Sequence, residues 1–158
     1  MIKTIKQQIV TAVSLLACIL AFSPVFSAQS DGLIRVESHH SVSMTIDRLQ
    51  AALEKRGMTV FKRIDHAAGA EKVGIHIRPT QLLIFGNPKV GTRLMQCSQE
   101  AAIDLPQKAL VYRDEAGHVW LTYNDPSYMS NRHHVVGCGA VIKKLSHALA
   151  HFATMATE

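Results

Sequence analysis

Hydrophobic residues recur along the chain with two different periods, which predict helices and strands. Apolar residues spaced three or four positions apart from Val42 to Leu53 predict an amphipathic helix, with Ser43 as its N-cap and Gly57 as its stop. A second helix is predicted near the C-terminus, where one apolar stripe contains Val141, Leu145, Ala148, Leu149 and Phe152. Both helices therefore have one face suited to packing against another layer.

Segments rich in β-branched and aromatic residues predict the strands. Residues 33–37 and 58–64 read as two strands, and residues 80–85 as a continuous apolar strand buried on both faces. Residues 108–113 and 118–123 flank a loop that contains Gly117, so they are expected to form a hairpin.

Two capping signals predict shorter helices between the strands. Asp65 can cap a helix that runs through Lys72, and Asn87 followed by Pro88 is a standard start for a helix that reaches Cys97. The chain of 158 residues has room for one domain. We therefore expect an α+β fold, a single compact domain with a mixed or antiparallel sheet and helices packed on it, over residues 29–158.

The first 28 residues read as a signal peptide. Two lysines precede the apolar run Ile9–Phe22, and small residues follow it, so cleavage is expected after Ser27 or Ala28. The run is shorter than the roughly 20 residues that span a bilayer. A retained anchor and lipidation at Cys18 are the alternatives. The mature chain is therefore expected to be periplasmic or secreted, with no membrane association after cleavage.

An oxidising compartment changes the interpretation of Cys97 and Cys138, the two cysteines outside the leader. Two thiols in such a compartment often form a disulfide, which here would close a loop of about 40 residues. Two separate buried thiols are the alternative, and spacing alone does not decide between them.

The charge of the chain gives no sign of a nucleic-acid partner. Seventeen Lys and Arg residues against twelve Asp and Glu residues give a formal net charge of +5. Without the two lysines of the leader, 15 basic and 12 acidic residues remain, and the net charge is +3. The basic residues are scattered, with no arginine-rich strip interleaved with aromatics. We therefore expect no nucleic-acid binding.

A set of short motifs runs through the middle of the chain. The motifs are Asp65–Ala70, Arg78–Thr80, Ile84–Pro88, Gly91–Thr92, Leu94–Met95, Ala102–Pro106, and Tyr123–Asn124 with Pro126. Together they resemble the bacterial family catalogued as domain of unknown function 302, from about Val36 to about His134. The resemblance implies a compact α+β fold, often a homodimer, and no agreed activity or catalytic residues. The chain departs from the commoner family pattern at Gln107, because an apolar residue usually follows the Leu-Pro pair at this position. Cys97 and Cys138 do not look like family positions.

Polar residues in these motifs suggest a ligand site. The start of the helix at Pro88 could offer free N–H groups to a small or anionic ligand, with Lys89 adding positive charge. A purely structural reading gives Asn87 the role of a cap and Asp104–Pro106 that of a turn. The residues expected to line one pocket are Asn87, Lys89, Asp104, Lys108, Asn124, Asp65 and His66.

Nine histidines, all after the leader, raise metal binding as the alternative function. His133 and His134 lie close in sequence to Cys138, and a mixed site there would compete with the disulfide. His147 and His151 share one helix face, but this face carries lysines and no nearby acid, so we interpret it as a solvated polar face.

No sequence signature of an enzyme is present. The chain has no nucleophile elbow, no phosphate-binding loop and no dinucleotide fingerprint. Asp65 and His66 together with Lys108 could in principle perform acid–base chemistry. The sequence thus favours an exported, non-enzymatic ligand-binding or interaction module that needs no cofactor.

Overall fold

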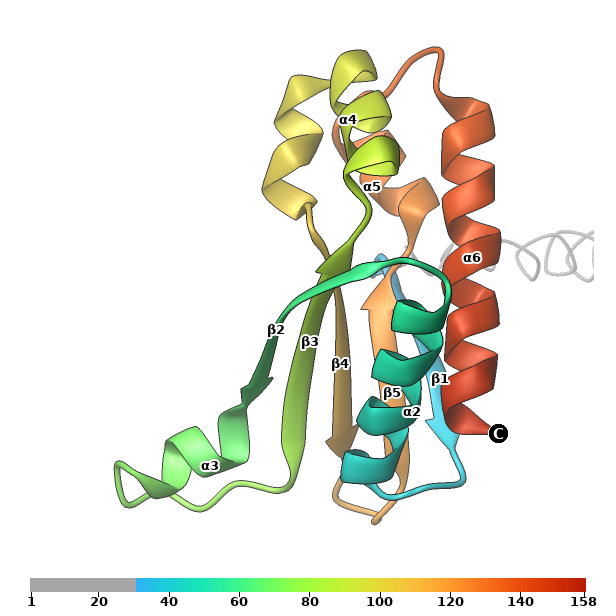
Figure 1. Cartoon of the computed structure of the whole chain (residues 1–158). Coiled ribbons are helices and arrows are strands. Elements are labelled where there is room, and N and C mark those ends of the chain that lie inside the picture. The colour runs from blue at the N-terminus through green and yellow to red at the C-terminus, as the bar shows by residue number, and fades with distance from the viewer. Residues whose placement is uncertain (1–30) are drawn as a thin grey trace, which may run out of the picture.

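The computed structural model describes residues 31–158, so the predicted leader and its cleavage site lie outside the described residues. Five strands form one antiparallel sheet in the order β1-β5-β4-β3-β2 (Figure 1). The strands are β1 (Leu33–Ser38), β2 (Thr59–Asp65), β3 (Thr80–Gly86), β4 (Gln107–Arg113) and β5 (Val119–Asn124). The predicted α+β domain and its hairpin are confirmed.

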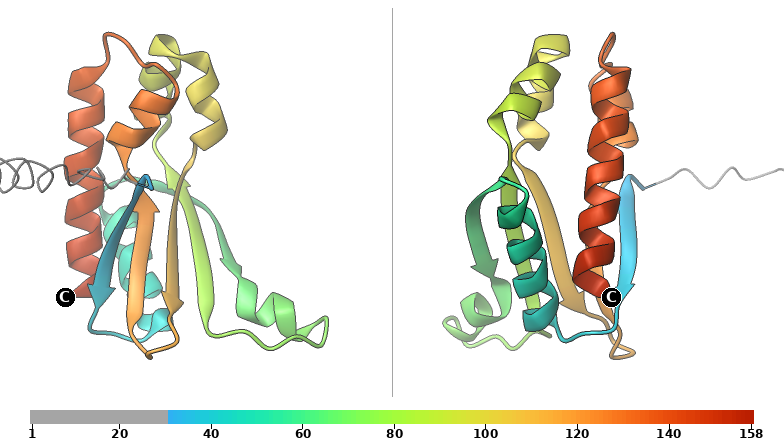
Figure 2. Two further views of the ribbon diagram at one scale, coloured as in Figure 1. Left: turned by 180° about the vertical axis from the view of Figure 1, so that it is seen from behind. Right: turned by 45° about the vertical axis from the view of Figure 1, so that its right-hand side comes forward.

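The two long helices lie on the same face of the sheet, side by side. The helices are α2 (Val42–Lys55), α3 (His66–Glu71), α4 (Pro88–Cys97), α5 (Pro126–Arg132) and α6 (Gly139–Thr157), with a 3₁₀ helix, η1 (Gln99–Asp104). Seen from behind in Figure 2, α2 and α6 lie behind the strands, and no helix from residues 31–158 lies over the opposite face of the sheet. In residues 31–158 no helix is both long and apolar enough to cross a membrane.

The core forms between this helical layer and the sheet. Ile46 and Leu53 from α2 are fully buried, as are Leu83 from β3 and Val111 from β4. The predicted apolar stripe of the last helix is confirmed, since Leu145, Leu149 and Phe152 are buried and Val141 and Ala148 pack against the core. The helical period in the sequence therefore located the faces that hold the fold together.

The N-cap of α2 is Ser41, not Ser43 as predicted. The Ser41 hydroxyl accepts a hydrogen bond from the backbone N–H of Met44, and the helix begins at Val42. The stop at Gly57 is confirmed, because this residue has a φ of +70°, which favours glycine.

The prediction that β3 is buried on both faces is wrong. Leu83 and Phe85 are buried beneath the helices, but Leu82 and Ile84 point to the other face and are only half-buried. Because no helix lies over that face, β3 alternates between a covered and an uncovered side. The uncovered side, called here the open face, carries Ile64, Leu82, Ile84, Leu110, Tyr112 and Trp120.

A segment between β2 and β3 extends from the end of the sheet, as Figure 1 shows at its lower left. This segment, called here the arm, consists of α3 and the loop of residues 72–79. None of the α3 residues is buried, and in the loop Val73 and Ile75 are 71% and 58% exposed. The arm therefore presents apolar side chains next to the open face.

Candidate functional site

The structure places the predicted site residues at opposite ends of the sheet. Asn87 follows the end of β3, Asp104 and Lys108 lie at the start of β4, and Asn124 ends β5, so these residues and Lys89 share one end (Figure 1). Asp65 and His66 lie where β2 ends, at the other end of the sheet and about 20 Å away along a seven-residue strand. One pocket lined by all seven residues is therefore excluded.

The start of α4 already uses its own N–H groups. The Asn87 side chain accepts from the Lys89 N–H at 2.9 Å, and the Asn87 carbonyl accepts from Val90 and Gly91, each at 3.0 Å. Pro88 has no N–H to offer. The geometry favours the structural reading of this motif, a cap, over an anion site.

Replacing Asn87 separates these two roles. We expect Asn87→Ala to lose about 1 kcal/mol of unfolding free energy, because the cap is lost, and Asn87→Asp to lose much less, because a carboxylate caps equally well. Denaturant unfolding of both variants measures the difference. Equal losses in the two variants would show that the capping hydrogen bond does not stabilise α4.

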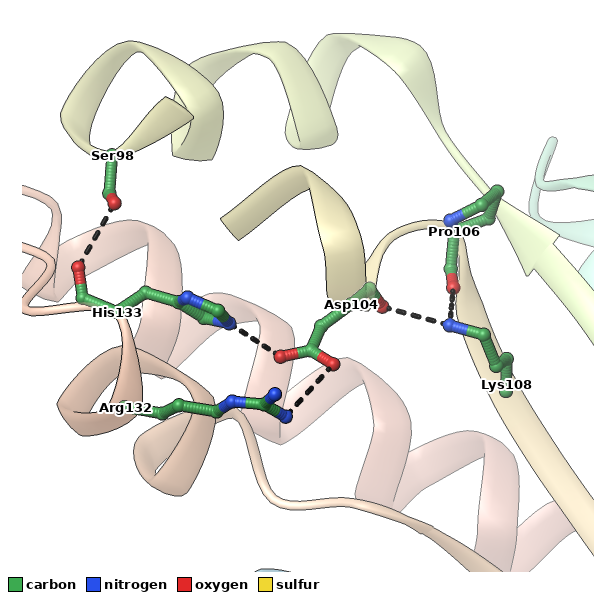
Figure 3. A network of polar contacts seen from close by, with 6 residues as sticks. All are labelled: Ser98, Asp104, Pro106, Lys108, Arg132 and His133. Atoms are coloured by element: carbon green, nitrogen blue, oxygen red, sulfur yellow. Dashed lines mark hydrogen bonds and ion pairs between the residues drawn. The ribbon is translucent and has the colours of Figure 1, made fainter. Parts of the chain in front are cut away.

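Asp104 is the centre of a polar cluster between η1 and α5 (Figure 3). Its Oδ2 lies 2.5 Å from Nε2 of His133, and its Oδ1 lies 3.5 Å from a guanidinium nitrogen of Arg132. The side chains of His133 and Asp104 are 7% and 16% exposed. Ser98 donates to the His133 carbonyl at 3.0 Å, so side-chain contacts join the η1 and α5 regions across 28 residues or more of sequence.

Lys108 is engaged in the same region. Its ammonium group donates to the carbonyl oxygens of Pro106 at 3.1 Å and Asp104 at 3.3 Å (Figure 3). Asn124 lies opposite Leu33 in the register of β5 and β1. Of the predicted residues at this end, Asn87, Asp104 and Lys108 thus use their side chains in contacts within the protein.

The alternative metal site is not found in the structure. His133 contacts Asp104, and Cys138 lies at disulfide distance from Cys97, with 6.2 Å between their Cα atoms. His151 lies on the exposed side of α6, 3.5 Å from a nitrogen of Arg56. Residues 31–158 contain no group of three or more histidine, cysteine or acidic side chains that could hold a metal ion.

A groove on the open face, at the root of the arm, is the candidate ligand site. Its volume is about 380 Å³, near the lower end of the range for small-molecule sites. Most of the apolar wall is provided by Ile77, Leu110 and Tyr112. The full lining is Ile77, Arg78, Thr80, Leu110, Tyr112, Arg113, Asp114 and Glu115.

Hydrogen bonds fix the polar wall of this groove. Oδ2 of Asp114 accepts from the Trp120 indole N–H at 2.8 Å, and Oδ1 accepts from the His118 N–H at 2.9 Å. These bonds, the Trp120 bond first, lower the pKa of the Asp114 carboxyl below its ordinary value. A hydrogen bond to Glu37, together with its charge, raises the pKa of His118. Asp114 therefore remains a carboxylate at neutral pH, with both oxygens engaged.

Sequence reasoning did not identify this groove. Arg78 and Thr80 were noticed only as part of a motif, and Arg113 and Asp114 only as parts of a hairpin. The groove forms because the backbone N–H of Arg113 donates to the carbonyl of Pro79, which holds the arm against the end of β4. That contact joins segments 34 residues apart, and no local pattern signals it.

Comparison with known proteins adds three curated relatives. The chain is 48% identical over 112 residues to the Fluoride-specific ion channel FluC 1 of Brucella suis and of Brucella abortus, and to FluC 2 of Brucella melitensis. The match covers 71% of this chain but only 42–44% of those proteins. The chain thus spans less than half the length of the curated relatives it matches.

The fold also matches a solved structure of unassigned function. It is the crystal structure of an uncharacterized conserved protein DUF302 from Bacillus stearothermophilus, with a TM-score of 0.72 and 18% identity, covering 80% of this chain and 99% of that one. The family model for Domain of unknown function DUF302 matches residues 34–152. With three quarters of its length matched in this way, the chain belongs to the DUF302 family.

Proposed function

We propose that the protein is an exported, non-catalytic module that binds a small ligand on the open face of its sheet. The observation that carries this proposal is the open face itself. In the part of the chain that the structure describes, helices cover one side of the sheet only, and the other side combines half-buried apolar residues such as Leu110 with a groove of about 380 Å³. Concave, mainly apolar sites with a few polar groups are typical of ligand binding.

The arrangement of the titratable residues supports binding rather than catalysis. A general acid or base must come within hydrogen-bond reach of its substrate. His133 and Asp104 instead contact each other in a nearly buried pair, and the Lys108 ammonium is held by two backbone carbonyls. These contacts support a structural role for the cluster, which holds η1 and α5 over the end of the sheet.

Export remains a prediction from the leader sequence. The approach of Cys97 to Cys138 supports it, because disulfides persist in oxidising compartments. N-terminal sequencing of exported material should find Ala28 or Gln29 as the first residue, and an intact Met1 in membrane fractions would contradict it. The homodimer implied by the family resemblance also stays a prediction.

The curated relatives suggest where such a module works. Their names describe fluoride-specific ion channels, and the stretch that matches this chain is less than half of each. We propose that this stretch folds as a DUF302-type α+β domain in those proteins, because it is 48% identical to this chain over 112 residues. Channel activity is not assigned to the matched stretch.

A thermal-shift experiment on the dialysed protein distinguishes ligand binding from metal binding. A ligand at ten times its Kd should stabilise the protein by about 1.4 kcal/mol, visible as a rise in Tm. We expect such a rise with small organic ligands and none with Zn²⁺ or Cu²⁺. Leu110→Ala in the groove should reduce the rise, while Leu33→Ala, on the same face outside the groove, should not. Stabilisation by a metal ion, or an equal rise in both variants, would contradict the proposal.

A further inference from the structure

The helix α4 lies beyond the end of the sheet and buries little of its surface (Figure 1). Leu94, which is 1% exposed, is its only buried residue. Within residues 31–158, no side chain of α4 makes an ion pair or a hydrogen bond with another element. Few non-covalent contacts therefore hold this helix in place.

The pair of cysteines joins the C-terminal end of α4 to α6. Cys97 is the last residue of α4, and Cys138 is the N-cap of the 19-residue helix α6. The Sγ atom of Cys138 also lies 3.4 Å from the carbonyl oxygen of Arg93, so the last turns of α4 contact the start of α6. A thiol is only a weak hydrogen-bond donor, so this contact alone does not replace a covalent bond.

The segment that follows α4 is held by other contacts. Asp104 of η1 contacts His133, and Ser98 donates to the His133 carbonyl at 3.0 Å. Neither contact involves a cysteine, so both are available whether the two cysteines are bonded or not. Loss of the bond should therefore affect α4 before it affects η1.

We propose that the bond between Cys97 and Cys138 is a redox-sensitive latch: when a dithiol reduces it, α4 separates from α6 while the sheet stays folded. Local opening occurs where few apolar side chains are buried, which is the case for α4. Separation exposes Leu94. The latch is independent of the groove, which lies on the open face at the root of the arm.

Thiol–disulfide exchange reduces the bond in two steps. Cys97 is half-buried and Cys138 is 6% exposed, so a thiolate of the reductant attacks the Sγ atom of Cys97. A new S–S bond joins the reductant to Cys97, and Cys138 leaves as a thiolate that takes a proton from water. The second thiolate of the reductant then attacks the reductant's own sulfur in this mixed disulfide, and Cys97 leaves and is protonated in the same way. The reductant ends as a disulfide, and the two cysteines have gained two electrons and two protons.

Hydrogen–deuterium exchange followed by mass spectrometry tests the latch. The purified protein is compared in its oxidised form and after reduction with dithiothreitol at neutral pH. We expect the amides of residues 88–97 to exchange about tenfold faster after reduction, because α4 opens locally. The amides of β3 and β4 should stay protected over the same exchange times in both forms, because their hydrogen bonds lie within the sheet.

Two variants serve as controls. The double variant with alanine at Cys97 and Cys138 should exchange in α4 like the reduced protein and should not respond to dithiothreitol. Ser98→Ala removes a hydrogen bond next to the same end of α4 but keeps both cysteines. Its α4 amides should stay protected in the oxidised form and exchange faster after reduction.

Three results would overturn the latch. Unchanged exchange in α4 after reduction would show that non-covalent contacts are enough to hold the helix. An equal loss of protection in α4 and in the sheet would show that the bond stabilises the domain only as a whole. A bond that dithiothreitol does not reduce in the folded protein would show that a thiol does not reach Cys97.

Discussion

Replacing Cys97 and Cys138 together by alanine should lower the free energy of unfolding by about 4 kcal/mol. The two residues are 41 positions apart and lie at disulfide distance, so a bond between them closes a long loop and reduces the entropy of the unfolded chain. It also joins the end of α4 to the start of α6. Denaturant unfolding under oxidising conditions measures the loss.

Alanine is preferred to serine because Cys138 occupies the N-cap of α6, where a serine hydroxyl could cap the helix and offset part of the loss. A reducing agent should bring the unmodified protein close to the double variant and have no effect on the variant itself. A double variant as stable as the original protein, or a peptide map showing both residues as free thiols, would refute the disulfide.

Asp104→Ala should cost about 3 kcal/mol of unfolding free energy. The substitution removes the partner of the nearly buried His133 side chain and one partner of Arg132, so polar groups lose their contacts where little water reaches them. Asp104→Asn should cost less, because an amide oxygen can still accept a hydrogen bond from His133. Denaturant unfolding at neutral pH compares the variants.

Asp47→Ala is the matched control for this prediction. Asp47 also pairs with an arginine, Arg63, but its side chain is 59% exposed, and exposed pairs contribute about 0–1 kcal/mol. If Asp104→Ala were no more destabilising than Asp47→Ala, the contacts between η1 and α5 would not help to hold the end of the domain together.

Local patterns in the sequence were enough to predict most of the elements. Asn87 and Asp65 cap the helices assigned to them, and Gly117 lies in the turn of the predicted hairpin. Each of these signals involves only a few neighbouring residues, so it can be recognised in the sequence without knowledge of the tertiary structure. The same kind of signal was overlooked once, since Asp125 followed by Pro126 starts α5 in the way that Asn87 and Pro88 start α4.

Features that depend on distant contacts were not predictable in this way. The apolar run from Thr80 to Phe85 does not show that one side of β3 stays uncovered, because the position of the helices decides it. The contact of Asp104 with His133 spans 29 residues and brings together side chains that the sequence assigned to two different candidate sites. The groove likewise depends on how the arm meets β4.

The central claim is that ligands bind on the open face and not at the end of the sheet where α4 begins. Amide ¹H–¹⁵N NMR spectra test it most directly, with the protein titrated with a small organic compound that raises its Tm in the thermal-shift experiment, because each shifted amide locates the contact. We predict shifts at Ile77, Leu110 and Tyr112, and none at Lys89 or Lys108. Shifts that cluster at Lys89 and Lys108 and leave the groove unchanged would contradict this account.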